Sequence, residues 1–157
     1  MRKTILGIFL LLPLSLGAAE LPVAQPFSLP DLDDVTHDLS EYRGRFLLLE
    51  FFITRCPDCT AMVPRLQRLR EAIPERFLAM VAINNREPVE RLRTYAQQHS
   101  ITYQILRDPT TEVFWRYNIE HVPTLFLIDP LGHILGTWDY GSEAEEAMEA
   151  ILLGNMY

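Results

Sequence analysis

The chain has 157 residues, of which 48% are hydrophobic, and its formal net charge is −7. This length is typical of one domain that buries a core of its own, and the sequence contains neither repeats nor low-complexity tracts. Because binding to phosphate backbones requires clustered cations, the acidic balance argues against nucleic acid as a partner.

Residues 1–19 have the layout of a secretory signal peptide. Two basic residues precede an apolar stretch from 5 to 16, and Gly17 and Ala19 supply small residues at positions −3 and −1 of a cleavage site. The apolar stretch is short for a transmembrane helix, which needs about 20 residues. We therefore expect export and a single mature domain over residues 20–157, with an uncleaved N-terminal membrane anchor as the alternative.

From residue 46 onward, segments with strand patterns alternate with segments with helix patterns. Residues 46–53 read FLLLEFFI, a nearly continuous apolar run that predicts a strand buried on both faces of a mostly parallel sheet. Pro57 suits the first position of a helix, where its missing N–H costs nothing. The order of elements indicates an α/β domain with helices over a central sheet, preceded by an extended lead-in at 20–30. The remaining patterns predict, in order, a strand at 77–83, a helix at 88–99, a strand at 103–106, a helix at 108–117, a strand at 124–129, a hairpin strand at 133–138 and a helix capped by Ser142 and Glu145.

The two cysteines, Cys56 and Cys59, are separated by two residues. A disulfide across so short a gap closes almost no loop, so it restricts the unfolded chain little and stabilises the fold poorly. A zinc site is the main rival interpretation, but zinc takes four ligands, there is no second Cys-x-x-Cys pair, and the histidines are scattered. The pair is therefore predicted to carry redox chemistry.

The expected position of the pair suggests a role for each cysteine. Cys56 follows a buried strand and begins a helix, so unpaired N–H groups and the positive end of the helix dipole favour its thiolate, which is the reactive nucleophile. Cys59 lies one turn further on, where it is more buried and suited to resolve a mixed disulfide. Arg55 adds positive charge that favours the thiolate, Asp58 opposes it, and the balance between them is left open.

Two further segments are candidates for the site. Glu50 is the one charged residue in an otherwise buried strand, so we expect burial to raise its pKa and to make it a proton carrier for Cys59. The alternative is a carboxylate at a sheet edge with access to water. His121 and Pro123 precede an apolar strand; local sequence does not set the isomer of Pro123, and we interpret His121 as an ordinary loop residue rather than one that tunes the thiolate.

Three segments together resemble the thioredoxin-like superfamily, over residues 26–153. FFITRCPDC resembles the strand and active-site motif, and HVPTLFLIDPLGHI resembles the proline loop and the hairpin after it. FSLPDLDDVTHDLSEYRGR is similar to the N-terminal extension of the TlpA/ResA-like branch, which shares it with peroxiredoxins. The resemblance implies a thioredoxin fold, with a central mixed sheet flanked by helices and an N-terminal extension.

The resemblance also implies roles for individual residues. Cys56 is expected to be the attacking thiol and Cys59 the resolving thiol of a redox-active disulfide, and Glu50 matches the buried acid of thioredoxins. Pro123 is expected to be a cis-proline that faces the disulfide, with Val122 offering backbone hydrogen bonds to an extended substrate. Members of this branch are usually periplasmic or membrane-tethered disulfide reductases, often serve cytochrome c maturation, and receive electrons from a membrane carrier.

The sequence departs from the family pattern at the site itself. Arg55 stands where the family usually has Trp, and we place it among the residues that contact substrate. Pro57-Asp58 resembles the oxidase type of motif, with proline first, and Met62 occupies a position where some members carry a functional Glu. These differences leave the direction of electron flow open. Peroxidase activity requires Thr or Ser three residues before the first cysteine, where this chain has Ile53.

We therefore predict a periplasmic thiol–disulfide oxidoreductase that reduces protein disulfides without a cofactor or bound metal. Its expected partners are protein disulfides and dithiols together with a membrane electron donor, and we expect a monomer. If the N-terminal segment is not cleaved, the same domain is tethered to the inner membrane. A disulfide-forming oxidase and a copper-binding chaperone that uses both cysteines and a histidine are the alternatives.

Overall fold

The computed structural model describes residues 20–139 and, further along, residues 146, 148, 150, 152 and 154. The predicted signal peptide at 1–19 and the predicted helix cap formed by Ser142 and Glu145 lie outside the described residues. Within the described part of the chain, no helix is long and apolar enough to cross a membrane.

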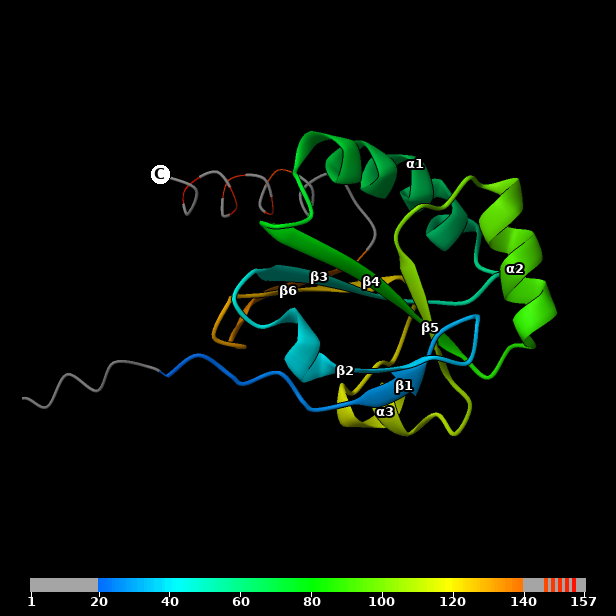
Figure 1. Ribbon diagram of the computed structural model, residues 1–157, viewed down its shortest axis with the longest axis horizontal. Coiled ribbons are helices and arrows are strands. Elements are labelled where there is room, and N and C mark those ends of the chain that lie inside the picture. Colours follow the sequence, from blue (N-terminus) through cyan, green and yellow to red (C-terminus); the bar gives the residue numbers. More distant parts are fainter. Residues whose placement is uncertain are drawn as a thin grey trace, which may run out of the picture.

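A mixed sheet occupies the centre of the molecule (Figure 1). Its strands are β3 (Phe46–Phe52), β4 (Leu78–Asn85), β5 (Gln104–Asp108), β6 (Thr124–Ile128) and β7 (Ile134–Asp139). They lie side by side in the order β5-β4-β3-β6-β7. Strand β4 runs parallel to β3 and β5, whereas β6 runs antiparallel to β3 and β7. Strand β3 is therefore internal, with a hydrogen-bonded neighbour on each side.

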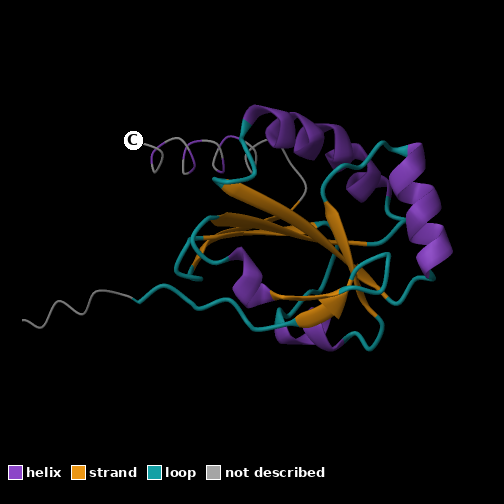
Figure 2. Cartoon of the chain, viewed as in Figure 1, coloured by secondary structure: helices purple, strands orange, loops and turns teal. Residues whose placement is uncertain are grey.

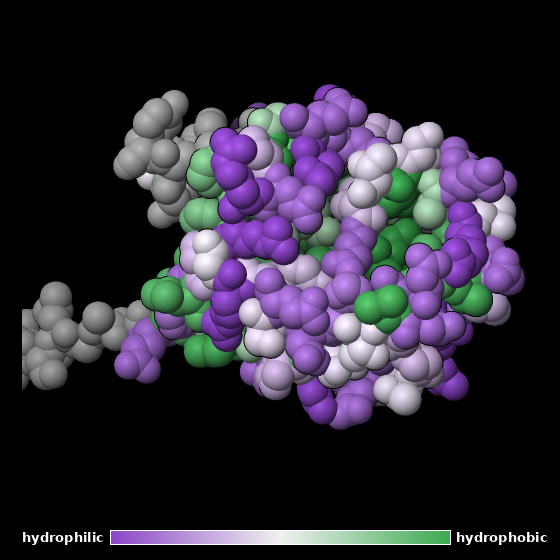
Figure 3. Space-filling view, viewed as in Figure 1, coloured by the Kyte–Doolittle hydropathy of each residue, from purple (hydrophilic) through white to green (hydrophobic). Residues whose placement is uncertain are grey.

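Layers of helix and irregular chain cover both faces of the sheet (Figure 2). One face carries the helices α1 (Pro57–Ala72) and α2 (Val89–Gln98). The other face carries the N-terminal extension and a short helix, which are β1 (Ser28–Pro30), β2 (Thr36–Asp38), the 3₁₀ helix η1 (Leu39–Tyr42) and α3 (Glu112–Arg116). Strands β1 and β2 pair antiparallel. Hydrophilic side chains cover most of the face of the molecule seen in Figure 3.

Burial on both faces explains the continuous apolar run of β3. Its odd-numbered residues from 47 to 51 pack with the N-terminal extension and α3. Leu48 and Phe52 pack with α1 and α2 on the opposite face. Because successive side chains of a strand point to opposite faces, Glu50 points the same way as Leu48 and Phe52, toward the layer that contains α1.

The predicted strands of the central sheet and the first two predicted helices are confirmed, with boundaries that differ by a few residues. The predicted helix at 108–117 is shorter, because α3 begins only at Glu112. Asp108 instead ends β5 fully buried, and its carboxylate accepts a hydrogen bond of 3.0 Å from the N–H of Phe114. Asp108 thus caps the helix from the end of a strand rather than from the position directly before the helix.

The two chain ends differ in how well the sequence predicted them. At the start of the domain, the last residues of the lead-in at 20–30 form β1, which pairs with β2. The sequence analysis predicted an extended segment here but not this strand pairing. At the other end, the described residues after 139 are helical, as the sequence predicted. Met148 and Leu152 are buried in the core on the α1 face of the sheet.

Candidate active site

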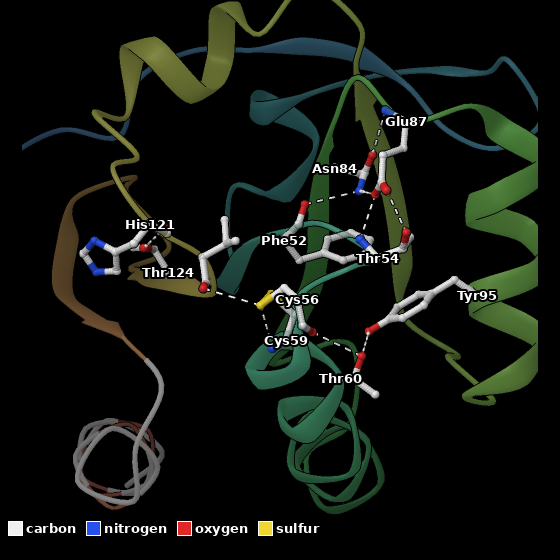
Figure 4. Close-up of a disulfide and its surroundings, with 11 residues drawn as sticks. Phe52, Thr54, Cys56, Cys59, Thr60, Asn84, Glu87, Tyr95, His121 and Thr124 are labelled. Atoms are coloured by element: carbon white, nitrogen blue, oxygen red, sulfur yellow. Dashed lines mark hydrogen bonds between the residues drawn. A yellow bond between two sulfur atoms is a disulfide. The ribbon is translucent and has the colours of Figure 1, made fainter.

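Cys56 and Cys59 form a disulfide at the start of α1 (Figure 4). Cys56 is the N-cap residue, and its Sγ accepts a hydrogen bond of 3.0 Å from the backbone N–H of Cys59. Pro57 follows at the first helical position, as predicted. Cys56 is 9% exposed and Cys59 only 1% exposed, so an incoming group reaches Cys56 first.

The loop before β6 lies against the same sulfur. The carbonyl oxygen of Val122 is 3.5 Å from Sγ of Cys56. The Val122–Pro123 peptide bond is cis, which is the isomer that the resemblance implied. The structure therefore brings Cys56, Val122 and Pro123 together, although the loop and the cysteine pair are far apart in the sequence.

Glu50 is buried on an internal strand, which overturns the alternative of a water-exposed carboxylate at a sheet edge. It pairs with Ala82 of β4 on one side and Leu125 of β6 on the other, and it is 4% exposed. Burial raises the pKa of Glu50 to about 8, and an interaction with the hydroxyl of Tyr103 offsets this only in part. The Tyr103 hydroxyl is buried without a hydrogen bond of normal geometry. A carboxyl with this pKa can both donate and accept a proton near neutral pH.

Arg55 and Asp58, which flank Cys56 with opposite charges, are both exposed. Neither forms an ion pair with another described residue, and both are open to solvent. The structure thus gives Arg55 no fixed position beside the Cys56 sulfur. It leaves the guanidinium accessible to a partner that docks at the disulfide.

His121 lies in the loop before β6 but is directed away from the disulfide (Figure 4). Its Nε2 is 2.6 Å from a carboxylate oxygen of Asp139, and both side chains are 60% exposed. The interpretation of His121 as an ordinary loop residue agrees with this arrangement. Among the described residues, no group of three or more His, Cys, Asp or Glu side chains could hold a metal ion.

Three polar residues beside the cysteine pair were missed by the sequence analysis: Thr54, Asn84 and Glu87 (Figure 4). The carboxylate of Glu87 accepts hydrogen bonds of 2.7 Å from the backbone N–H of Thr54, from the Thr54 hydroxyl and from the Asn84 amide. The Asn84 amide also donates to the carbonyl of Phe52 at 3.2 Å. Burial by itself raises the pKa of Glu87, but the hydrogen bonds from Thr54 and Asn84 outweigh it and hold the pKa below its ordinary value.

One signal could have pointed to this group. The polar run at residues 84–87 directly follows a strand expected to lie parallel to the strand before Cys56. Carboxyl ends of adjacent parallel strands meet at one edge of a sheet, which is where sites form in α/β proteins. The register confirms this proximity, since Phe52 pairs with Asn84.

The fold and the site define a thioredoxin-fold protein with a Cys-x-x-Cys disulfide. Residues 22–136 match the AhpC/TSA family, and the chain therefore belongs to this thioredoxin-like family.

Proteins similar to this chain carry names that refer to disulfide chemistry. Thiol-disulfide oxidoreductase ResA of Geobacillus kaustophilus is 32% identical over 111 residues, which are 71% of this chain and 64% of that protein. The chain thus spans less than two thirds of that relative's length. Thioredoxin-like protein YneN of Bacillus subtilis is 31% identical over 121 residues, which are 75% of this chain and 70% of that protein.

Solved structures show the same fold. A thiol-disulfide oxidoreductase from Bacteroides fragilis superposes with a TM-score of 0.74 at 25% identity, over 82% of this chain and 98% of that one. The thioredoxin domain of a thiol-disulfide oxidoreductase from Bacteroides vulgatus gives a TM-score of 0.77 at 19% identity, over 87% of this chain and 99% of that domain.

Proposed function

We propose that the protein is a thiol–disulfide oxidoreductase that acts on protein disulfides through Cys56 and Cys59. The observation that carries the proposal is the position of the Cys56 sulfur. It lies at a helix N-terminus, accepts the N–H of Cys59 and is the more exposed of the two sulfurs. A hydrogen bond and a helix terminus both stabilise a thiolate, which is the form of cysteine that attacks disulfides.

In the reducing direction, the Cys56 thiolate attacks one sulfur of a substrate disulfide and displaces the other sulfur as a thiolate, which takes up a proton. The Cys59 thiolate then attacks the Cys56 sulfur of the mixed disulfide. This step closes the Cys56–Cys59 bond and releases the second substrate thiol. Two electrons pass from the dithiol to the substrate, and a separate reductant must restore the dithiol.

Glu50 fits the second step. Cys59 must lose its proton before it can attack, and it is almost fully buried, so water has little access to it. Glu50 points to the α1 side of the sheet, and its pKa of about 8 suits a group that takes a proton near neutrality. We assign Glu50 as the proton acceptor for Cys59.

Val122, Pro123 and Arg55 form the proposed contact surface for substrate. A peptide bonded to Cys56 lies beside the loop before β6, because the Val122 carbonyl is 3.5 Å from the sulfur. Backbone groups of Val122 are then available for hydrogen bonds to an extended peptide, as in β-strand addition. The exposed Arg55, directly before Cys56, is available to contact the same peptide.

We further propose that the protein works in the periplasm as a monomeric reductase, receives electrons from a membrane donor and contributes to cytochrome c maturation. The signal-like layout of residues 1–19 supports export. The resemblance to the TlpA/ResA-like branch, whose members are usually reductases, supports the reducing direction, and relatives named thiol-disulfide oxidoreductase ResA support the disulfide chemistry. Tethering to the inner membrane through the same N-terminal segment is the alternative.

Reduction of insulin disulfides tests the activity. The wild-type protein is expected to catalyse the reaction when supplied with a chemical reductant, and Cys56→Ser is expected to lose this catalysis. Retained catalysis in Cys56→Ser contradicts the proposal. Tight copper(I) binding by a wild-type protein that has no exchange activity also contradicts it, in favour of the copper-chaperone alternative.

A further inference from the structure

The segment that carries Cys56 has little regular structure of its own. Residues 53–56 connect β3 to α1, and the backbone N–H of Cys56 bonds to the carbonyl of Ile53 at 3.4 Å. The path of this segment decides where the Cys56 sulfur lies relative to the N–H of Cys59. A small shift in it would break the 3.0 Å hydrogen bond between them.

A neighbouring loop fixes this segment. Glu87, which follows β4, bonds both the backbone N–H and the hydroxyl of Thr54, two residues before Cys56. Asn84 is fully buried and bonds to Glu87 and to the carbonyl of Phe52. The backbone N–H of Glu87 in turn donates to the Asn84 side chain at 3.3 Å. The group therefore holds the chain on both sides of Ile53.

A carboxylate is an unexpected choice for such a role. An anion near a cysteine opposes its thiolate, and the Glu87 side chain is only 11% exposed, so solvent screens it poorly. Arg91 balances the charge only from 3.9 Å. Arg86, directly before Glu87, also has a left-handed φ of 58°, a conformation that costs free energy in a residue other than glycine. These costs are explained if the carboxylate has a positioning task at the site.

We propose that Glu87 is a positioning residue that, through Thr54, holds the Cys56 sulfur within reach of the Cys59 N–H and so stabilises the Cys56 thiolate. The proposal rests on the thiol–disulfide function proposed above. Its geometric effect and its charge act in opposite directions, since the hydrogen bonds favour the thiolate and the negative charge disfavours it. This opposition makes the two effects separable by mutation.

Two substitutions of Glu87 separate position from charge. In Glu87→Gln, the amide oxygen can accept from the Thr54 and Asn84 N–H groups, and its NH₂ group can donate to the Thr54 hydroxyl, which is able to accept. The bonds are kept and the charge is removed. In Glu87→Ala, both are lost. Glu90→Ala is the matched control, because Glu90 is an exposed glutamate in the first turn of α2, three residues after Glu87, and its carboxylate bonds to neither Thr54 nor Asn84.

The measurement is the pKa of the Cys56 thiol in the reduced protein, from the pH dependence of alkylation and of thiolate absorbance. The other charged or titratable groups adjoining the segment are Arg55 and Asp58, which flank Cys56 in the sequence, Arg91, which lies 3.9 Å from Glu87, and Tyr95, whose hydroxyl bonds to Thr60. All of them are unchanged in these variants. Glu87→Ala is expected to raise the Cys56 pKa. At a fixed pH below the wild-type pKa, the fraction of Cys56 present as thiolate then falls by about threefold or more. Glu87→Gln is expected to leave the Cys56 pKa unchanged or lower, and Glu90→Ala to leave it unchanged.

Two results overturn the proposal. Equal lowering of the Cys56 pKa in both Glu87 variants shows that Glu87 acts only as a charge. An unchanged Cys56 pKa in both Glu87 variants, together with a lower melting temperature, shows that Glu87 only supports the fold. If Glu87→Ala does not fold, Thr54→Val replaces it as the test variant. This substitution removes the hydrogen bond from the Thr54 hydroxyl to Glu87 and keeps the one from the backbone N–H. A smaller rise in the Cys56 pKa is then expected, and no rise overturns the proposal. The alkylation assay needs no substrate protein, so its result is independent of whether insulin is reduced.

Discussion

The carbonyl oxygen of Val122 lies 3.5 Å from the Sγ atom of Cys56, although 66 positions separate the two residues in the chain. The contact joins the loop before β6 to the N-terminus of α1. Under the proposed function, a substrate bonded to Cys56 also lies beside this loop, so we expect the two segments to act as one site.

The unequal exposure of the two cysteines predicts which of them traps a substrate. With a protein disulfide substrate, Cys59→Ser is expected to accumulate the mixed disulfide with Cys56, because the resolving thiol is missing. Cys56→Ser serves as the control and is expected to trap almost none, since Cys59 is only 1% exposed. Non-reducing electrophoresis measures the trapped fraction. Equal trapping by both variants contradicts the assignment of Cys56 as the attacking thiol.

The raised pKa of Glu50 predicts a pH-dependent stability. The folded protein holds this proton up to a pH of about 8, whereas the ordinary pKa is 4.5. The free energy of unfolding therefore falls as pH rises between these two values, by on the order of a few kcal/mol. Urea unfolding at several pH values should show this fall in the wild type and a smaller fall in Glu50→Gln. Glu71→Gln, at an exposed position of α1, is the control, and parallel profiles for wild type and Glu50→Gln contradict the prediction.

The proposed proton transfer predicts a kinetic effect at the same residue. Glu50→Gln cannot accept a proton from Cys59, so resolution of a mixed disulfide is expected to slow by roughly 100-fold near neutral pH. The first attack by Cys56 should change little. Rapid quenching with acid measures both steps. A variant that slows the first step and spares the second does not fit the role assigned to Glu50.

His37 links two acidic residues of the N-terminal extension. Its ring nitrogens lie 3.0 Å from a carboxylate oxygen of Glu41 and 3.2 Å from one of Asp31. Burial by itself lowers the pKa of His37, but the hydrogen bonds to Glu41 and Asp31 raise it overall. Its stabilising effect is therefore present below the ordinary pKa of 6.5 and is lost as pH rises through the raised value. His37→Gln should lower stability by roughly 1 kcal/mol in acid and much less in mild alkali. Calorimetry of the wild type and His37→Gln in acid and in mild alkali checks this prediction. An equal loss of stability under both conditions counts against it.

The aromatic cluster under the sheet predicts a large loss of stability. Phe51 is fully buried, and its ring centroid lies 5.0 Å from the rings of Phe114 and Tyr117. Phe51→Ala is expected to cost about 3–5 kcal/mol in chemical denaturation. Trp115→Ala is the matched control, because Trp115 is 79% exposed and its truncation should change stability by less than about 0.5 kcal/mol. Similar losses for the two variants contradict this description of the core.

Local pattern was sufficient to predict the elements that carry the cysteine pair. A continuous apolar run marks an internal strand, and a proline at the next turn marks a helix start, so Cys56 could be placed at a helix N-terminus from nearby residues alone. The β1–β2 pair was missed because strands of three residues show no measurable period. The start of α3 was misplaced because Asp108 caps that helix from the preceding strand.

The supporting contacts of the site depend on register and could not be predicted locally. Glu87 reaches Thr54 only because β3 and β4 are parallel with Phe52 opposite Asn84, which no pattern within either strand determines. The cis form of the Val122–Pro123 bond is likewise a property of the folded chain and was implied only by the resemblance. For Glu50, the sequence left open whether the carboxylate lies at a sheet edge, and the strand order places it on an internal strand; its role as a proton carrier stays a prediction.

The reduction potential of the Cys56–Cys59 couple, measured by equilibration with glutathione, tests the proposed reductase most directly. We predict a value near that of thioredoxin, about −270 mV, which makes the protein a reductase that depends on an electron donor. A value near about −120 mV, at which the dithiol form is strongly stabilised, would contradict the reductase and identify a disulfide-forming oxidase.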